Sequence, residues 1–226
     1  MKKQRGFVYG AAILSGANII CKILGFLFKV PLANLIGREG MGYFSLAYQV
    51  FGVVTVVAVS GLPMALARMV AGRKSFGRTQ EAAGLLRMAV GLFAAIGASG
   101  TILLLILAKP FANFAGSEPA WYAVAALAPT TFFVAVMAAF RGYFQGMGQM
   151  APTAISQIVE ASGKLIFGIS LAWLLFLKGF SPEIVAAGAI CGVTIGAAAA
   201  CGVLAARARG HLAKGKTKLP SGTKRT

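Results

Sequence analysis

The sequence has no aspartate and few charged residues of any kind. Charged side chains make up 12% of its 226 residues, against roughly 25% in an ordinary soluble domain. Its acidic residues are five glutamates, whereas lysine and arginine together number 22, which gives a formal net charge of +17. Hydrophobic residues make up 58% of the chain. This shortage of charge argues against a soluble domain.

Histidine and cysteine are also scarce. The single histidine, His211, lies in a basic C-terminal segment, and the three cysteines, Cys21, Cys191 and Cys201, lie in apolar stretches. Their spacing fits neither a metal site nor a disulfide framework. Without aspartate, an intramembrane histidine or a cysteine–histidine cluster, the chain lacks the side chains for a metal site or a nucleophilic triad. We therefore expect no metal, no cofactor and no enzymatic activity.

Long apolar stretches dominate what is present. Runs of about 20 apolar residues recur, which is the length that crosses a bilayer core of about 30 Å. They predict an all-α integral membrane protein, a bundle of six transmembrane helices with short connections and no soluble domain. The C-terminal residues 206–226 lose apolar periodicity and are expected to form a flexible basic tail. The expected spans are residues 7–29, 42–63, 84–107, 120–140, 155–177 and 183–205.

The basic residues gather on one side of the expected membrane. Most of them lie before the first span, in the connection after the second span, and in the C-terminal tail. The positive-inside rule then places both termini in the cytoplasm, as in a multi-pass protein of the cytoplasmic membrane. We attribute the excess of basic over acidic residues to this orientation and to contact with anionic membrane lipids, and we expect no nucleic-acid partner.

The first expected span carries polar residues along one face. Ser15, Asn18, Lys22, Gly25 and Lys29 alternate in spacings of three and four residues, which places them within a sector of roughly 80°. A lysine near the bilayer centre costs on the order of 2.5–3.5 kcal/mol. Lys22 is therefore expected to face the bundle interior or a water-filled cavity, whereas Lys29 can reach the membrane surface.

The fifth expected span repeats this pattern. Thr153, Ser156, Gln157, Glu160 and Lys164 share one side of the helix, and Glu160 precedes Lys164 by four residues, the favourable order for an ion pair. That pair either fixes the helix register or takes part in transport, and the residues alone leave both open. Together the two polar faces predict a cationic cavity between the first and fifth spans, suited to an anionic cargo.

The sixth expected span has a face of small residues. Gly188, Gly192 and Gly196 are four residues apart. Small residues at this spacing let helix backbones approach closely in a membrane. We expect a packing surface there and no binding site.

The segment FRGYFQGMGQMAPTAISQIVE, residues 140–160, joins the fourth and fifth spans. Arg141 is expected to end the fourth span on the cytoplasmic side, where a cation complements the helix C-terminus. Gly142 and the two glycines that follow favour a tight turn. Arg141, Gly142 and Gln145 are the candidate functional residues of this joint.

This joint resembles the one between the fourth and fifth helices in the polysaccharide-exporter and lipid-flippase branch of the MOP (MATE-like) superfamily. The first 80 residues are similar to stage V sporulation protein B-like members, with KILGF in the first span, GREGMGYF at the start of the second and SGLPMALAR at its end. The resemblance covers nearly all of residues 6–205.

The resemblance implies a flippase that moves an undecaprenyl-pyrophosphate-linked oligosaccharide or peptidoglycan precursor across the membrane, for cell wall, spore cortex or polysaccharide export. It implies that Lys22 meets the pyrophosphate in a central cavity, with Lys29 near a second basic position, and that Arg38 and Glu39 form the outer mouth. Members have two six-helix lobes. This chain matches one of them, so a second lobe or a second copy is an expected partner.

Two other functions stay open. A MATE-type drug exporter is disfavoured by the cationic groove and by the lack of an intramembrane aspartate. A non-transporting membrane scaffold or remnant is favoured by the half length of the chain relative to family members.

Overall fold

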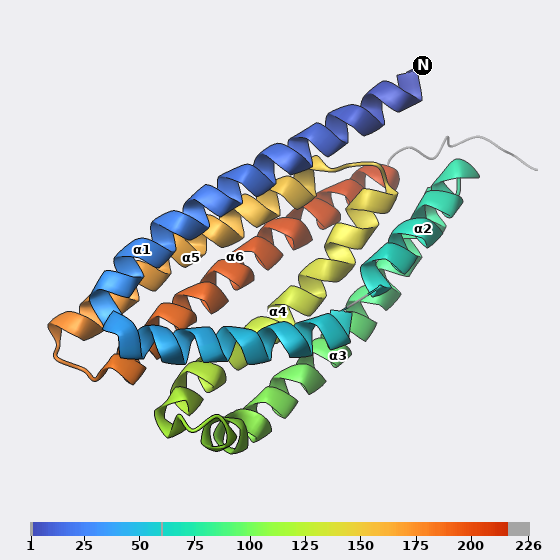
Figure 1. The fold of residues 1–226 in the computed structure, drawn as a ribbon. Helices are drawn as coiled ribbons and strands as arrows, with labels where there is room; N and C mark the ends of the chain where they lie inside the picture. Colours follow the sequence, from blue (N-terminus) through green and yellow to red (C-terminus); the bar gives the residue numbers. More distant parts are fainter. Residues whose placement is uncertain (1, 60, 217–226) are drawn as a thin grey trace, which may run out of the picture.

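In the computed structural model, which describes residues 2–59 and 61–216, every element is a helix (Figure 1). The described residues contain no strand, which confirms the all-α class. Five stretches are long and apolar enough to cross a membrane, and they fall in α1, α3, α4 with η1, α5 and α6. The elements are α1 (Lys2–Val59), α2 (Leu62–Ser75), α3 (Thr79–Phe114), the 3-10 turn η1 (Glu118–Ala120), α4 (Trp121–Gly146), α5 (Ala151–Leu177) and α6 (Pro182–Lys216).

Helix α1 consists of two limbs separated by a bend. Its apolar part, Tyr9–Val56, has 48 residues, about twice the length of one crossing. Gly37 has φ 67° and ψ −168°, a backbone conformation that is essentially restricted to glycine. Figure 1 shows the helix turning sharply, so that the first limb (residues 2–36) and the second limb (residues 38–59) run in different directions. The expected loop between the first two spans is therefore wrong, because the chain stays helical up to the bend.

Helix α2 is a short helix at residues where the sequence predicts the end of a span and a connection. It follows Gly61, whose φ of 79° breaks the helical path, and it has a proline in its first turn. It packs against α4 through glycine, because a Cβ on Gly142 would lie 2.7 Å from the carbonyl oxygen of Pro63. Gly142 is thus a helix-packing residue and not a turn residue as expected. The turn glycine is Gly148, with φ 69°.

The C-terminal part of the chain is more helical than expected. Helix α6 continues to Lys216, so residues 206–216 of the expected flexible tail are helix. The remainder of that tail, residues 217–226, lies outside the described residues.

Small residues hold α5 against α6. Gly192 packs directly on the backbone of Gly168. A Cβ on Gly196 would lie 2.7 Å from the carbonyl oxygen of Glu160 and 2.8 Å from the backbone nitrogen of Lys164. The expected packing surface is confirmed, and it fixes the turn of α5 that carries both charged residues.

Helix α4 lies at the centre of the bundle. It contributes to both hydrophobic core clusters and packs against α3, α6, α2 and α1. Helix α5 instead packs mainly against α6 and the first limb of α1, and it touches α4 little (Figure 1).

Candidate functional site

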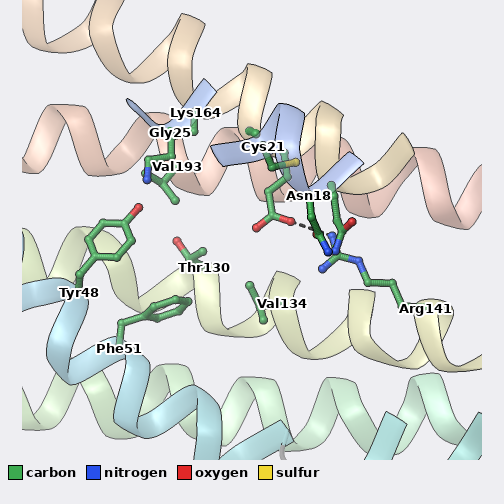
Figure 2. A pocket seen from close by; sticks show the side chains of 13 residues that line it. Asn18, Cys21, Gly25, Tyr48, Phe51, Thr130, Val134, Arg141, Lys164 and Val193 are labelled. Carbon is green, nitrogen blue, oxygen red and sulfur yellow. Dashed lines mark hydrogen bonds and ion pairs between the residues drawn. The ribbon is translucent and has the colours of Figure 1, made fainter. Parts of the chain in front are cut away.

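A pocket of about 320 Å³ lies between α1, α4 and α5 (Figure 2). Its charged residues are Arg141, Lys164 and Glu160, two cations and one anion, so that its formal net charge is +1. The first limb of α1 contributes Asn18, Cys21 and Gly25, the second limb Tyr48 and Phe51, α4 Thr130, Val134 and Arg141, α5 Gln157, Glu160, Ala161 and Lys164, and α6 Val193.

A second cavity, also of about 320 Å³, adjoins the first. Gly25, Tyr48 and Lys164 line both cavities. The second cavity adds Lys29, one of the expected site residues, together with aromatic and polar side chains of the second limb. Lys164 therefore lies where the two cavities meet.

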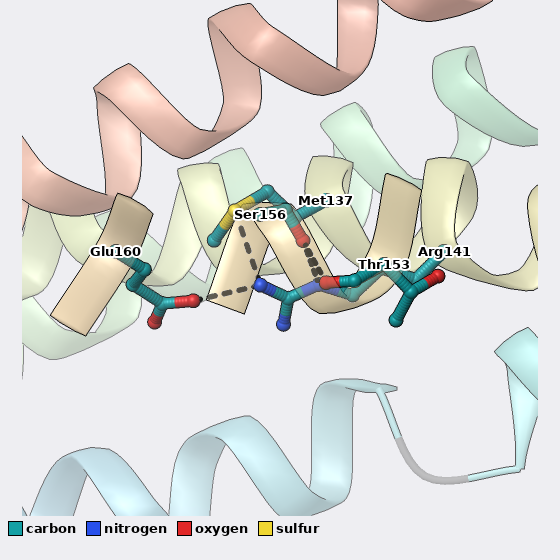
Figure 3. Close-up of polar contacts among 5 residues, drawn as sticks. All are labelled: Met137, Arg141, Thr153, Ser156 and Glu160. Atoms are coloured by element: carbon teal, nitrogen blue, oxygen red, sulfur yellow. Dashed lines mark hydrogen bonds and ion pairs between the residues drawn. The ribbon is translucent and has the colours of Figure 1, made fainter. Parts of the chain in front are cut away.

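Arg141 links α4 to α5 across the pocket (Figure 3). Its Nη2 donates to Oε2 of Glu160 at 2.7 Å and contacts Sδ of Met137 at 3.8 Å. Its Nε donates to Oγ of Ser156 at 3.1 Å, and Ser156 in turn donates to the carbonyl oxygen of Thr153 at 2.7 Å. The side chains of Arg141 and Glu160 are 21% and 30% exposed, so both can be reached from the pocket.

Two expectations for these residues are wrong. Arg141 does not end its helix, because α4 continues to Gly146 and the guanidinium turns into the pocket. Glu160 pairs with Arg141 and not with Lys164, which takes part in no ion pair among the described residues. Arg141 is the partner of Glu160 in place of Lys164 because its guanidinium donates a short, charge-assisted hydrogen bond from a neighbouring helix.

Lys164 is held by aromatic rings. Its Nζ lies 4.6 Å from the ring centroid of Phe28, 4.8 Å from that of Tyr48 and 5.9 Å from that of Phe44. A cation over the faces of aromatic rings is attracted by about 0.5–2 kcal/mol per favourable contact. We call these three rings the aromatic box. Nothing in the sequence near Lys164 signals it, since the rings come from both limbs of α1.

Two buried polar atoms in the pocket have no hydrogen-bond partner among the described residues. They are Oη of Tyr48 and Oε1 of Gln157. Buried polar atoms are nearly always hydrogen-bonded in native proteins, so these two residues that line the pocket have unused hydrogen-bonding capacity. Gln157 lines the pocket together with Glu160, as their spacing on one side of the helix predicts.

The structure does not bring every expected residue of the first span into this pocket. Asn18 lines it, but Lys22 is exposed and lines neither cavity. Neither of these two cavities is therefore the one expected for Lys22, and its place in the bundle interior or in a water-filled cavity stays a prediction.

The remaining candidates lie apart from the pocket. Arg38 and Glu39 begin the second limb, both are exposed, and Oε1 of Glu39 accepts a hydrogen bond from Tyr43 at 2.8 Å. Gln145 is half-buried near the end of α4 and does not line the pocket. Among the residues that the structure describes, no three histidine, cysteine or acidic side chains gather at one place.

Comparison with known proteins decides the family. Residues 7–223 match the sequence pattern of a family described as polysaccharide biosynthesis protein. The chain belongs to the polysaccharide biosynthesis protein family. This membership confirms the resemblance to the lipid-flippase branch of the MOP superfamily. With its apolar helices, this polysaccharide biosynthesis family member is a multi-pass membrane protein.

Three relatives from Bacillus subtilis (strain 168) illustrate the match. Stage V sporulation protein B is 31% identical over 191 residues, which cover 84% of this chain and 36% of that protein. The lipid II flippase MurJ is 27% identical over 187 residues, 79% of this chain and 34% of that protein. The uncharacterized membrane protein YabM is 27% identical over 203 residues, 90% of this chain and 36% of that protein. The chain spans about a third of the length of these relatives.

Proposed function

We propose that the chain is a flippase, or one lobe of a flippase, for an undecaprenyl-pyrophosphate-linked oligosaccharide or peptidoglycan precursor in the cytoplasmic membrane. The observation that carries the proposal is the charged pocket inside an apolar bundle whose relatives include a lipid II flippase. Cations inside a membrane protein are costly and are kept where they serve a pathway or a ligand. A diphosphate is an anion that needs cations of this kind.

The two cations suit the two parts of a diphosphate differently. The guanidinium of Arg141 offers a planar fork of donors that matches phosphate oxygens, whereas the ammonium of Lys164 acts as a point charge. The exposed surface of the first limb is apolar around Lys22, with Ile19, Ile23 and Phe26 exposed by 61%, 55% and 68%. A prenyl chain can remain in the lipid beside the bundle while the diphosphate enters the pocket.

The position of Lys22 favours a second lobe or a second copy of the chain beside this bundle. It lies on the exposed surface of an apolar limb, where contact with lipid tails would be unfavourable. We propose that this surface faces a second six-helix lobe or a second copy of the chain. Transport would then follow from rocking of one bundle against the other about the site between them.

Flipping by the purified chain tests the proposal. The chain is reconstituted in liposomes with a fluorescent prenyl-diphosphate-linked oligosaccharide, and the labelled lipid accessible to a membrane-impermeant quencher is followed over time. We expect flipping by the wild type, a loss with Lys164→Gln, and no change with Lys178→Gln, an exposed lysine at the end of α5 outside both cavities.

The same assay separates the other functions. Liposomes with the wild-type chain that flip no faster than empty liposomes contradict a flippase made of this chain alone. Wild-type binding of the lipid without flipping would then favour a non-transporting scaffold. Export of cationic drugs in place of the anionic lipid would favour the drug exporter.

A further inference from the structure

Glu160 is an unexpected residue in a pocket for an anion. It is the single acidic residue among those lining the two described cavities, where the cations are Arg141, Lys164 and Lys29. Its side chain is 30% exposed, and its Oε2 accepts a hydrogen bond from Nη2 of Arg141 at 2.7 Å. A bound diphosphate would be repelled by this carboxylate and would compete with it for the same guanidinium.

The orientation of Arg141 does not depend on Glu160 alone. Its Nε is held by Oγ of Ser156, which is fully buried and is itself anchored to the carbonyl oxygen of Thr153. Figure 3 shows this contact on the side of the guanidinium away from the carboxylate. Removing Glu160 would therefore leave the guanidinium in place and free Nη2 for another acceptor.

Lys164 has no direct ion-pair partner among the described residues. Among the described residues its Nζ makes neither an ion pair nor a hydrogen bond, and its partners are the rings of the aromatic box. Ring faces attract the charge but do not replace oxygen acceptors for its three N–H donors. The pocket thus holds one cation in a direct ion pair and one cation whose N–H donors have no oxygen acceptor among the described residues.

We propose that Glu160 is an internal competitor that weakens anion binding in the pocket so that the cargo can be released. The inference rests on the proposed function, because it takes the cargo to be a diphosphate. On entry, the diphosphate binds at Lys164 and displaces the carboxylate from Nη2 of Arg141. On exit, the return of the carboxylate to Arg141 helps to displace the diphosphate.

A transport pathway requires this balance. A site must bind well enough for entry and weakly enough for exit. Two unopposed cations in a pocket of low dielectric would hold a diphosphate tightly, because charge attraction is several times stronger there than in water. One carboxylate beside them reduces that attraction without removing either cation.

Titration of the purified full chain with inorganic pyrophosphate tests the role of Glu160. We expect Glu160→Gln to bind pyrophosphate about ten- to a hundredfold more tightly than the wild type, the order given by removing one unit charge roughly 6–12 Å away at an effective dielectric near 20. Lys164→Gln should weaken binding by a similar factor. Matched controls are Glu118→Gln and Lys178→Gln, which neutralise exposed residues outside both cavities and should leave the affinity unchanged.

The sign of the Glu160→Gln effect decides the inference. Affinity equal to or weaker than that of the wild type overturns it and makes the ion pair a structural link between α4 and α5. If Glu160→Gln is not folded, as judged by its thermal unfolding, Glu160→Ala carries the same expectation and Glu160→Asp, which keeps the charge, should bind as the wild type does. A wild-type chain that binds no pyrophosphate overturns the anionic cargo itself, which is a failure of the proposed function.

A prenyl diphosphate in mixed micelles, titrated in the same way, distinguishes a lipid-linked from a soluble diphosphate. Tighter binding than that of inorganic pyrophosphate supports the lipid-linked cargo. Equal or weaker binding overturns that source.

Discussion

Replacing Gly196 with alanine is expected to destabilise the protein and to disturb the pocket together. A Cβ at this position would lie 2.7 Å from the carbonyl oxygen of Glu160 and 2.8 Å from the backbone nitrogen of Lys164, inside the 3.0 Å that real Cβ atoms respect. The opposing atoms are backbone and cannot rotate away. Helix α6 must therefore move away from α5 at the turn that carries both charged residues.

The magnitude follows from two opposing effects. Overpacking a close contact costs about 1–3 kcal/mol, whereas alanine in place of glycine favours a helix by about 0.5–1 kcal/mol. Gly202 lies on the same helix with no atom within 4 Å of its added Cβ, so that Gly202→Ala gains the helix term alone. Because both variants gain the helix term, we expect their free energies of unfolding to differ by the overpacking cost of about 1–3 kcal/mol, with Gly196→Ala the less stable.

Denaturant unfolding of the two purified variants in detergent measures this difference, and titration with pyrophosphate reports on the pocket. Gly196→Ala should also bind pyrophosphate more weakly than the wild type, because the turn bearing Lys164 has shifted. A Gly196→Ala variant at least as stable as Gly202→Ala would refute the close packing of α5 on α6.

Three further changes test other parts of the structure. Gly37→Ala should lower the free energy of unfolding by about 1–3 kcal/mol, because the backbone of Gly37 is at φ 67° and ψ −168°. The control Gly42→Ala, in regular helix, should not lower it. Equal thermal unfolding of the two variants would contradict the bend. Arg141→Ala should destabilise the protein by about 1–3 kcal/mol, because it leaves Glu160 unpaired. In a double-mutant cycle, its effect and that of Glu160→Ala should not be additive. Additive effects would exclude a stabilising pair. Lys22→Ala should abolish flipping with membrane insertion intact, and wild-type flipping by this variant would remove Lys22 from the pathway.

The helical architecture and the polar face of α5 were predictable because both depend on local periodicity. A run of apolar residues defines a helix without knowledge of its neighbours, and spacings of three and four place Gln157, Glu160 and Lys164 on one side. The glycine face of α6 was predictable for the same reason. The bend at Gly37 was not, because the charged residues that follow it resemble a loop although the backbone remains helical.

The partners of the charged residues could not be read from local spacing. The favourable spacing of Glu160 and Lys164 predicted an ion pair, but α4 brings Arg141 to 2.7 Å from the same carboxylate. The aromatic box joins Lys164 to rings in both limbs of α1, far away in the sequence. Such contacts depend on how helices pack, which hydrophobic periodicity does not specify.

The aromatic box has a mechanical consequence, because it bridges the bend of α1. Phe28 belongs to the limb before Gly37, and Phe44 and Tyr48 belong to the limb after it. A change in the angle between the limbs must separate Phe28 from Phe44 and Tyr48. At present the ring centroids of Phe28 and Phe44 are 5.9 Å apart. Each ring that withdraws from Lys164 removes about 0.5–1 kcal/mol of attraction and leaves its charge less shielded. The electrostatic potential of the pocket is therefore tied to the angle between two helices.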